Sequence, residues 1–203
     1  MKSNFQFLQE EWAEFYQRAF KAEQLVITDP RTSLSYARMA LELAVNWMYN
    51  HDYDLELPHD TSLNSLLKSY EFRNQFPHKL YTEIDLIRKV GNLAIHNKAV
   101  SVRDSEQIIS NQYYFSKWFA KSYTEIDLGQ LGLFEWKYVP QEGAEALSKK
   151  QLAALQGKFD KELDQFQAEL EDSNKKNLAL AEENELLKKR LAEQQATIEA
   201  NKE

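Results

Sequence analysis

Three side chains able to act on a phosphate ester stand at helical spacing between Asp85 and Asn97. Arg88, Asn92 and His96 follow one another at intervals of four residues in an otherwise largely apolar stretch. Residues four apart lie on one face of a helix. A histidine there can serve as a general acid or base, and an arginine can hold a phosphate. The spacing is equally typical of a structural Asn–His pair at the end of a buried helix, so both interpretations stay open.

A second polar pair precedes this stretch. Arg38 and Glu42 stand four residues apart, and two interpretations are possible. The first is an intrahelical ion pair, which contributes a few tenths of a kcal/mol when exposed. The second is a polar pair that faces Arg88 and His96. The segment 51–61 contains histidines and aspartates, but their spacing matches no known ligand set, and we predict no metal site.

The elements that position these groups are predicted to be helices, because the chain has only 5 Gly and 4 Pro among its 203 residues and these residues interrupt helices. Asp29 is predicted as an N-cap followed by Pro30 at the first helical position. Asp104 is predicted as another N-cap, in a capping box with Gln107. Apolar periodicity predicts helices over residues 4–27, 30–49, 62–70, 79–97 and 105–123, and a loop at 72–78. The predicted inward residues of the second helix are Leu34, Ala37, Ala40, Leu41, Ala44, Val45 and Met48.

The predicted core-facing side chains of the 85–97 stretch are Leu86, Val90, Leu93 and Ile95. Gly91 is best explained by close packing of a neighbouring helix, since glycine disfavours a helix by ~1 kcal/mol relative to alanine. The aromatic residues of 105–123 are interpreted as core, because base stacking would require them on an exposed basic surface. Residues 126–143 lose the helical period and are predicted to form an extended strap on the bundle.

Residues 144–203 have the pattern of a coiled coil. Apolar residues alternate at spacings of four and three over several heptads, which is typical of a helix that pairs with another. Two asparagines at a positions favour a two-stranded parallel pairing, because each can hydrogen-bond its mate; a single solvated helix or a foreign partner helix is the alternative. The predicted oligomerisation residues are Leu163, Leu170, Asn177, Leu180, Asn184, Leu187, Leu191 and Ile198.

Composition limits the possible functions. The net charge is −7, which disfavours a general nucleic-acid-coating role. The chain contains no cysteine, so disulfides and thiolate metal sites are excluded. Neither a signal peptide nor an apolar run of the ~20 residues that span a bilayer occurs, and we expect a cytoplasmic protein. The predicted organisation is a helical bundle at 1–125, a strap or linker at 126–143 and a coiled coil at 144–203.

Three sequence motifs together resemble a known family. They are S-N-F-Q-F-L at 3–8, D-P-R-T-S-L-S-Y-A-R-M-A-L-E at 29–42 and I-R-K-V-G-N-L-A-I-H-N at 87–97. In this order they resemble the N-terminal helical domain of unknown function of type I restriction enzyme motor subunits and related DEAD/DEAH-type helicases, which a coiled coil commonly follows. The resemblance covers about residues 3–125 and implies an all-α, HEPN-like bundle.

The resemblance implies a non-catalytic N-terminal interaction and oligomerisation module of a DNA-translocating restriction enzyme that defends against foreign DNA. Its expected partners are a second copy of the chain or other subunits of a restriction–modification complex, with DNA contacted by the parent protein and no membrane. No Walker-type phosphate-binding motif occurs in the chain. ATP and Mg²⁺ are therefore expected only in motor and nuclease domains outside it.

The same resemblance carries an alternative function. Ribonucleases of the HEPN superfamily use an arginine, four to six intervening residues and a histidine. Here seven residues lie between Arg88 and His96, one more than in that pattern. Six residues lie between Lys89 and His96, but that pair begins with a lysine. The alternative is a ribonuclease, or an RNA- or nucleotide-binding domain, that uses Arg88, Asn92 and His96 with Arg38 and Glu42 nearby. A nucleic-acid adaptor is a third possibility, for which the sequence shows no basic stripe.

Overall fold

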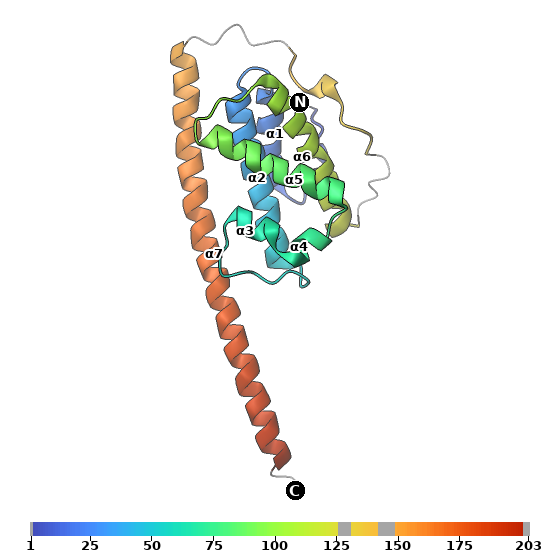
Figure 1. Ribbon diagram of the computed structural model, residues 1–203, viewed down its shortest axis with the longest axis vertical. Coiled ribbons are helices and arrows are strands. Elements are labelled where there is room, and N and C mark those ends of the chain that lie inside the picture. Colours follow the sequence, from blue (N-terminus) through green and yellow to red (C-terminus); the bar gives the residue numbers. More distant parts are fainter. Residues whose placement is uncertain (1, 126–130, 142–148, 201–203) are drawn as a thin grey trace. The chain divides into compact units, whose positions relative to one another are not determined.

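The computed structural model describes residues 2–125, 131–141 and 149–200 (Figure 1). These residues form helices and no strand, so the predicted all-α class is confirmed. The chain divides into two compact units, Met1–Gln156 and Gly157–Glu203. The elements are the 3₁₀ helices η1 (Gln6–Leu8) and η3 (Trp136–Tyr138) and the helices α1 (Ala13–Leu25), α2 (Pro30–His51), α3 (Leu63–Lys68), α4 (Tyr70–Asn74), α5 (His78–Ile95), α6 (Val102–Tyr123) and α7 (Lys149–Ala200).

Helix α2 is the centre of the first unit. It contacts α1, α3, α5 and α6, and Figure 1 shows it passing between α1 and α5. Asp29 caps it as predicted, accepting a hydrogen bond from Thr32 N–H at 3.1 Å, and Pro30 is its first residue. A helix covered on several sides is buried around most of its circumference. The predicted inward residues are all buried, namely Leu34, Ala37, Ala40, Leu41, Ala44, Val45 and Met48.

The first predicted helix is divided in two. A short 3₁₀ turn, η1, ends at Leu8, and α1 begins only at Ala13 after the non-helical residue Trp12 (φ −133°, ψ 65°). This break allows Phe5 and Leu8, both fully buried, to reach the core. An uninterrupted helix over residues 4–27 is therefore wrong, because burial of these two side chains requires the chain to turn before α1.

The segment after α3 also differs from the prediction. Residues 72–78 were expected to be a loop, but Tyr70–Asn74 form α4. The reason is local, because the Ser69 hydroxyl accepts a hydrogen bond from Phe72 N–H at 3.1 Å and so caps a new helix. Phe72 is fully buried and anchors α4 to the bundle.

The start of α6 lies three residues before the predicted one. Ser101, not Asp104, is the N-cap, and the two residues form a reciprocal capping box. Ser101 N–H donates to Asp104 at 2.8 Å and Asp104 N–H donates to the Ser101 hydroxyl at 3.2 Å. The aromatic residues of α6 were predicted to be in the core. This is confirmed for Tyr113, Phe115 and Phe119, which are buried.

The strap is described for residues 131–141, and the rest of the predicted range 126–143 lies outside the described residues. Asn4 holds it by two hydrogen bonds, from Nδ2 to Glu135 O at 3.0 Å and from Glu135 N–H to Oδ1 at 2.8 Å. Tyr113 Oη donates to Gly132 O at 2.9 Å, and Val139 is buried. The strap therefore joins the N-terminal turn to α6.

Helix α7 occupies residues 149–200 of the predicted coiled-coil segment, and 144–148 and 201–203 lie outside the described residues. Its 52 residues correspond to about 78 Å at 1.5 Å per residue. Within the part of the chain that the structure describes, no helix is both long enough and apolar enough to cross a membrane.

Candidate functional site

The candidate polar site lies where α2 crosses α5 at Gly91. A Cβ atom built on Gly91 would lie 2.5 Å from Arg38 Cβ and 3.2 Å from Leu34 O. The two backbones can approach this closely only because glycine has no side chain. The interpretation of Gly91 as a point of close helix packing is confirmed.

The side chains that α5 turns into the core are not those predicted. Ile84, Ile87, Gly91 and Ala94 are buried, whereas Leu93 is 46% exposed. Leu86, Val90 and Ile95 are only partly buried. The predicted inward position of Leu93 is wrong, because the close approach to α2 selects the face that carries Gly91 and Ala94 rather than the face with the larger apolar residues.

Arg38 and Glu42 form an ion pair within α2, with 3.0 Å between Nη1 and Oε2. Their side chains are only 14% and 11% exposed, so this is not the exposed pair of the first interpretation. Burial raises the pKa of Glu42, and the positive charge of Arg38 offsets part of that increase. Arg38 packs against α5 at Gly91. The pair thus belongs to the α2–α5 contact.

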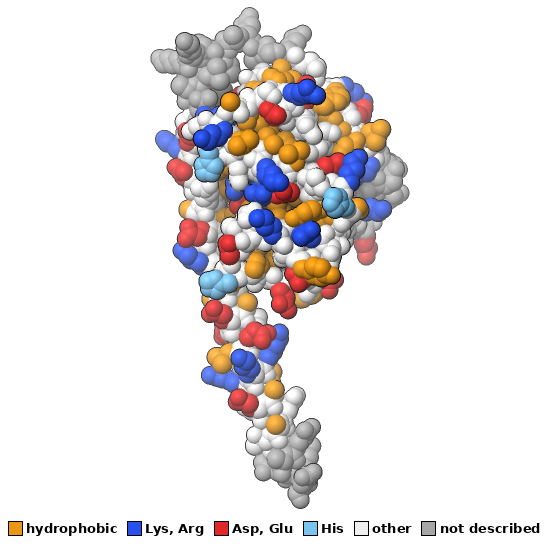
Figure 2. Space-filling model, viewed as in Figure 1, with side chains coloured by type: hydrophobic (Ala, Val, Ile, Leu, Met, Phe, Trp, Pro, Cys, Tyr) orange, Lys and Arg blue, Asp and Glu red, His pale blue; other side chains and the backbone are white. Residues whose placement is uncertain are grey.

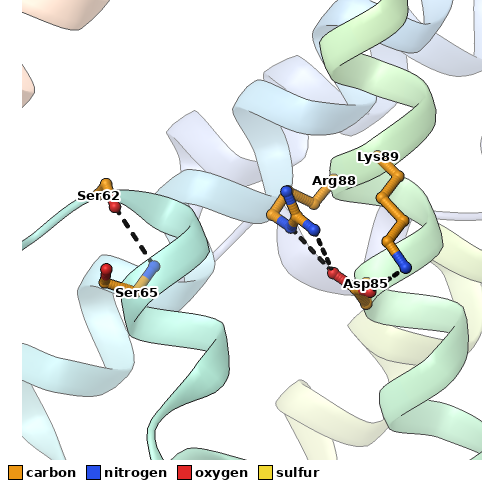
Figure 3. A network of polar contacts seen from close by, with 5 residues as sticks. All are labelled: Ser62, Ser65, Asp85, Arg88 and Lys89. Carbon is orange, nitrogen blue, oxygen red and sulfur yellow. Dashed lines mark hydrogen bonds and ion pairs between the residues drawn. The ribbon is translucent and has the colours of Figure 1, made fainter.

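Arg88 is engaged with Asp85, one turn toward the start of α5. Its Nε and Nη2 atoms both donate to Asp85 Oδ1, at 2.9 and 2.7 Å. Lys89 Nζ lies 2.7 Å from the other oxygen of Asp85, so the carboxylate bridges two cations (Figure 3). Burial acts to raise the pKa of Asp85, but the hydrogen bonds from Lys89 and Arg88 outweigh it and hold that pKa below its usual value.

His96 lies just beyond the last residue of α5 and is exposed. Its backbone N–H donates to Asn92 O at 3.0 Å, and Asn97 takes a left-handed conformation (φ 56°) that ends the helix. Arg31 Nε, from the start of α2, donates to Ala94 O at 3.1 Å. In the described part of the chain, the His96 ring makes no hydrogen bond, either to Asn92 or to Arg88.

The predicted site is therefore only partly assembled. Arg38, Glu42 and Gly91 meet where α2 crosses α5. The guanidinium of Arg88 points toward Asp85 (Figure 3). His96 lies eight residues further along the chain, at the C-cap of α5. Among the described residues, no hydrogen bond or ion pair joins Arg88 to His96. The polar residues at the crossing stabilise the packing of α2 against α5. Arg88 and His96 are not directed at a common substrate atom.

A buried polar contact that the sequence did not reveal lies at the N-terminus. Glu23 is fully buried, and its Oε1 accepts hydrogen bonds from Asn4 N–H at 3.1 Å and from Asn4 Nδ2 at 2.7 Å. Burial raises the pKa of Glu23, against the opposing effect of hydrogen bonds from Ser3 and Asn4. Nineteen residues separate Asn4 from Glu23, so no helical spacing indicated the contact.

Replacing Glu23 with Gln is expected to change how the free energy of unfolding depends on pH. The folded-state pKa of Glu23 lies above its unfolded-state value, so its stabilising effect is complete below the unfolded-state pKa and is lost as the pH rises through the folded-state pKa. Glu23→Gln should therefore gain stability relative to the wild type as the pH rises above the unfolded-state pKa of glutamate. Urea unfolding at several pH values measures this difference.

The control is Glu14→Gln, because Glu14 is an exposed glutamate on the same helix. Glu14→Gln should show no gain of stability relative to the wild type as the pH rises. A Glu23→Gln protein that also shows no such gain would contradict the assignment.

The predicted oligomerisation residues all lie on α7. The structure does not describe the side chain of one of them, Ile198. Leu180, Leu187 and Leu191 are 56%, 46% and 58% exposed. Positions seven residues apart drift by only ~20° per heptad on a straight helix, so the a and d residues form one continuous stripe. The ion pairs Lys175–Glu171, Lys176–Asp172 and Lys188–Glu185 lie at other heptad positions. These charged residues therefore lie outside the apolar stripe.

Comparison with known proteins identifies no relative. No family model matches the chain, and no curated protein or solved structure matches it significantly.

Proposed function

We propose that this chain is a non-catalytic interaction and oligomerisation module of a type I restriction-like, ATP-dependent DNA translocase acting in the cytoplasm. In this proposal α7 joins two copies of the chain in a parallel pair. Motor and nuclease activities belong to other domains of the parent protein.

The observation that carries the proposal is the exposed part of the apolar stripe of α7, from Leu180 to Leu191. Three leucines at a and d positions are each about half exposed, at Leu180, Leu187 and Leu191. In a coiled coil such residues insert between four side chains of the facing helix, and fully burying one leucine contributes ≈ 1.5–3 kcal/mol. Asn177 and Asn184 stand at a positions of the same stripe, where asparagine favours two parallel strands.

The bundle supports a structural rather than a catalytic role. Arg38 and Glu42, in the second motif that carries the family resemblance, are used in the buried α2–α5 contact. Arg88, in the third motif, is held by Asp85. A ribonuclease site would need Arg88 and His96 to act on one phosphate. Arg88 lies within α5 and is held by Asp85, whereas His96 lies beyond the end of the helix, which does not favour this. We therefore do not propose the ribonuclease alternative.

The test compares two adjacent leucines in sedimentation velocity. Leu187 is a d residue on the stripe, and Leu186 is an equally exposed leucine at a c position (46% and 50%). Leu187→Asp should weaken self-association at least ~10-fold, because a buried unpaired carboxylate in the seam is strongly unfavourable. Leu186→Asp should associate like the wild type. Equal effects of the two substitutions would refute a heptad seam.

A further inference from the structure

A hollow between α4 and the beginning of α5 has the chemistry of a ligand site. Its volume is about 310 Å³, at the lower end of the ≈ 300–1,000 Å³ typical of small-molecule sites. Two tyrosines, an arginine, an asparagine and a histidine surround a buried phenylalanine at its base. The lining residues are Tyr70, Arg73, Asn74, Phe76, His78 and Tyr81.

The polar groups of the hollow are not used by the fold. Arg73, Asn74 and His78 are exposed, and Tyr70 is 73% exposed. Within the described part of the chain, their side chains make no hydrogen bond or ion pair. Guanidinium, amide, imidazole and phenol groups thus remain available to a ligand at one place on the surface.

The aromatic and cationic groups are arranged together. The Arg73 guanidinium lies 5.3 Å from the centre of the Tyr81 ring, a distance at which a cation and an aromatic face attract. Phe76 packs against Trp118 with 4.2 Å between ring centres. The base of the hollow is therefore fixed by the core, while Arg73 is held at its wall by the Tyr81 ring.

The surface around the hollow is locally basic on an acidic chain. Residues 68–89 contain five Lys and Arg against three Asp and Glu, a net charge of +2, whereas the whole chain carries −7. On the face drawn in Figure 2, Lys and Arg side chains lie beside α4 and over the middle of α5, with hydrophobic and acidic side chains between them. This patch was not evident from the sequence, because its cations are spread over three helices.

We propose that this hollow binds one unpaired nucleotide of a single-stranded nucleic acid. A nucleobase presents a flat face that stacks on aromatic side chains and on arginine, and a hydrogen-bonding edge that an asparagine amide can meet. Its phosphate carries a negative charge that Arg73 and His78 can approach. A base inside a duplex is stacked on both faces and cannot enter a hollow of this size. The assignment uses the bundle alone and does not depend on the role of α7.

The test is fluorescence anisotropy of the full chain with labelled oligothymidylate, oligouridylate and a blunt DNA duplex. At least one single strand should bind, with the duplex at least ~10-fold weaker. Tighter binding of oligothymidylate identifies DNA as the source of the nucleotide, and tighter binding of oligouridylate identifies RNA. With one or two phosphates contacted, log K should fall with log salt at a slope of about −0.7 to −1.4.

Arg73→Ala and Tyr70→Ala should each weaken binding about 10-fold, as expected for loss of one stacking or phosphate contact. Both residues are exposed, so neither substitution should unfold the protein. The matched controls, Arg103→Ala and Tyr53→Ala, change exposed residues outside the hollow and should leave the affinity within about twofold. Absence of binding, equal binding of the duplex, or equal losses in the controls would overturn the proposal.

Discussion

Replacing Gly91 with Ala is expected to destabilise the protein by about 1–3 kcal/mol, the usual effect of overpacking a core. The added methyl group would lie 2.5 Å from Arg38 Cβ. That atom is fixed to the α2 backbone, so a rotamer change cannot move it away. The helices must separate, which disturbs the buried Arg38–Glu42 pair as well. Alanine favours a helix by ~1 kcal/mol over glycine, so a net loss would show that the steric effect dominates.

Gly157→Ala is the matched control for this prediction. Gly157 also lies within a helix, α7, but a Cβ atom there would have no neighbour within 4 Å. Only the helix-propensity term then applies, and Gly157→Ala should not reduce stability. Urea unfolding followed by circular dichroism compares the two variants. A Gly91→Ala protein as stable as the wild type would show that the α2–α5 crossing is not tightly packed.

Replacing Gln112 with Met is expected to stabilise the protein by about 1–3 kcal/mol, the free energy lost when a buried polar group has no partner. Gln112 lies on α6 and is fully buried. In the described part of the chain, neither its Oε1 nor its Nε2 has a hydrogen-bond partner. The same holds for the hydroxyl of Ser116, one turn later on α6. Methionine has a similar length and no amide to desolvate, so the core should gain stability.

Gln107→Met provides the comparison, because Gln107 is an exposed glutamine on the same helix. Its effect should stay within about 0.5 kcal/mol. Thermal or urea unfolding measures both variants. A loss of stability in Gln112→Met would mean that the amide is satisfied, for example by an internal water molecule that also reaches Ser116.

The sequence predicted those features of the fold that depend on local signals. The Asp29–Pro30 start of α2 and its inward residues were correctly identified, because a cap and a 3.6-residue apolar period are both readable within one helix. Ser101 was missed as the cap of α6 because Asp104 is also a good capping residue. Both residues take part in the capping box, and only the structure shows which of them starts the helix.

The predictions that were wrong concern features of the fold that depend on tertiary contacts. The buried face of α5 was predicted wrongly, because the apolar pattern placed the large residue Leu93 in the core. Close approach to α2 instead requires a small residue, and the buried face therefore carries Gly91. The division of the first helix depends on burial of Phe5 and Leu8, and no local signal marks it.

At the candidate site, too, the features set by tertiary contacts could not be predicted from the sequence. The intrahelical pair Arg38–Glu42 was readable from its spacing, but its burial and its contact with Gly91 were not. The hollow formed by Tyr70, Arg73 and Tyr81 was missed, because α4 was read as a loop and its side chains could not be placed beside α5.

Sedimentation equilibrium of the unmodified chain at several concentrations tests the proposed role of α7 most directly. A single chain has a mass of 23.8 kDa. If the stripe that contains Leu180, Leu187 and Leu191 pairs two copies, the apparent mass should rise to twice that value as concentration increases. A mass of 23.8 kDa at every concentration would contradict self-association and with it the oligomerisation function proposed for this protein.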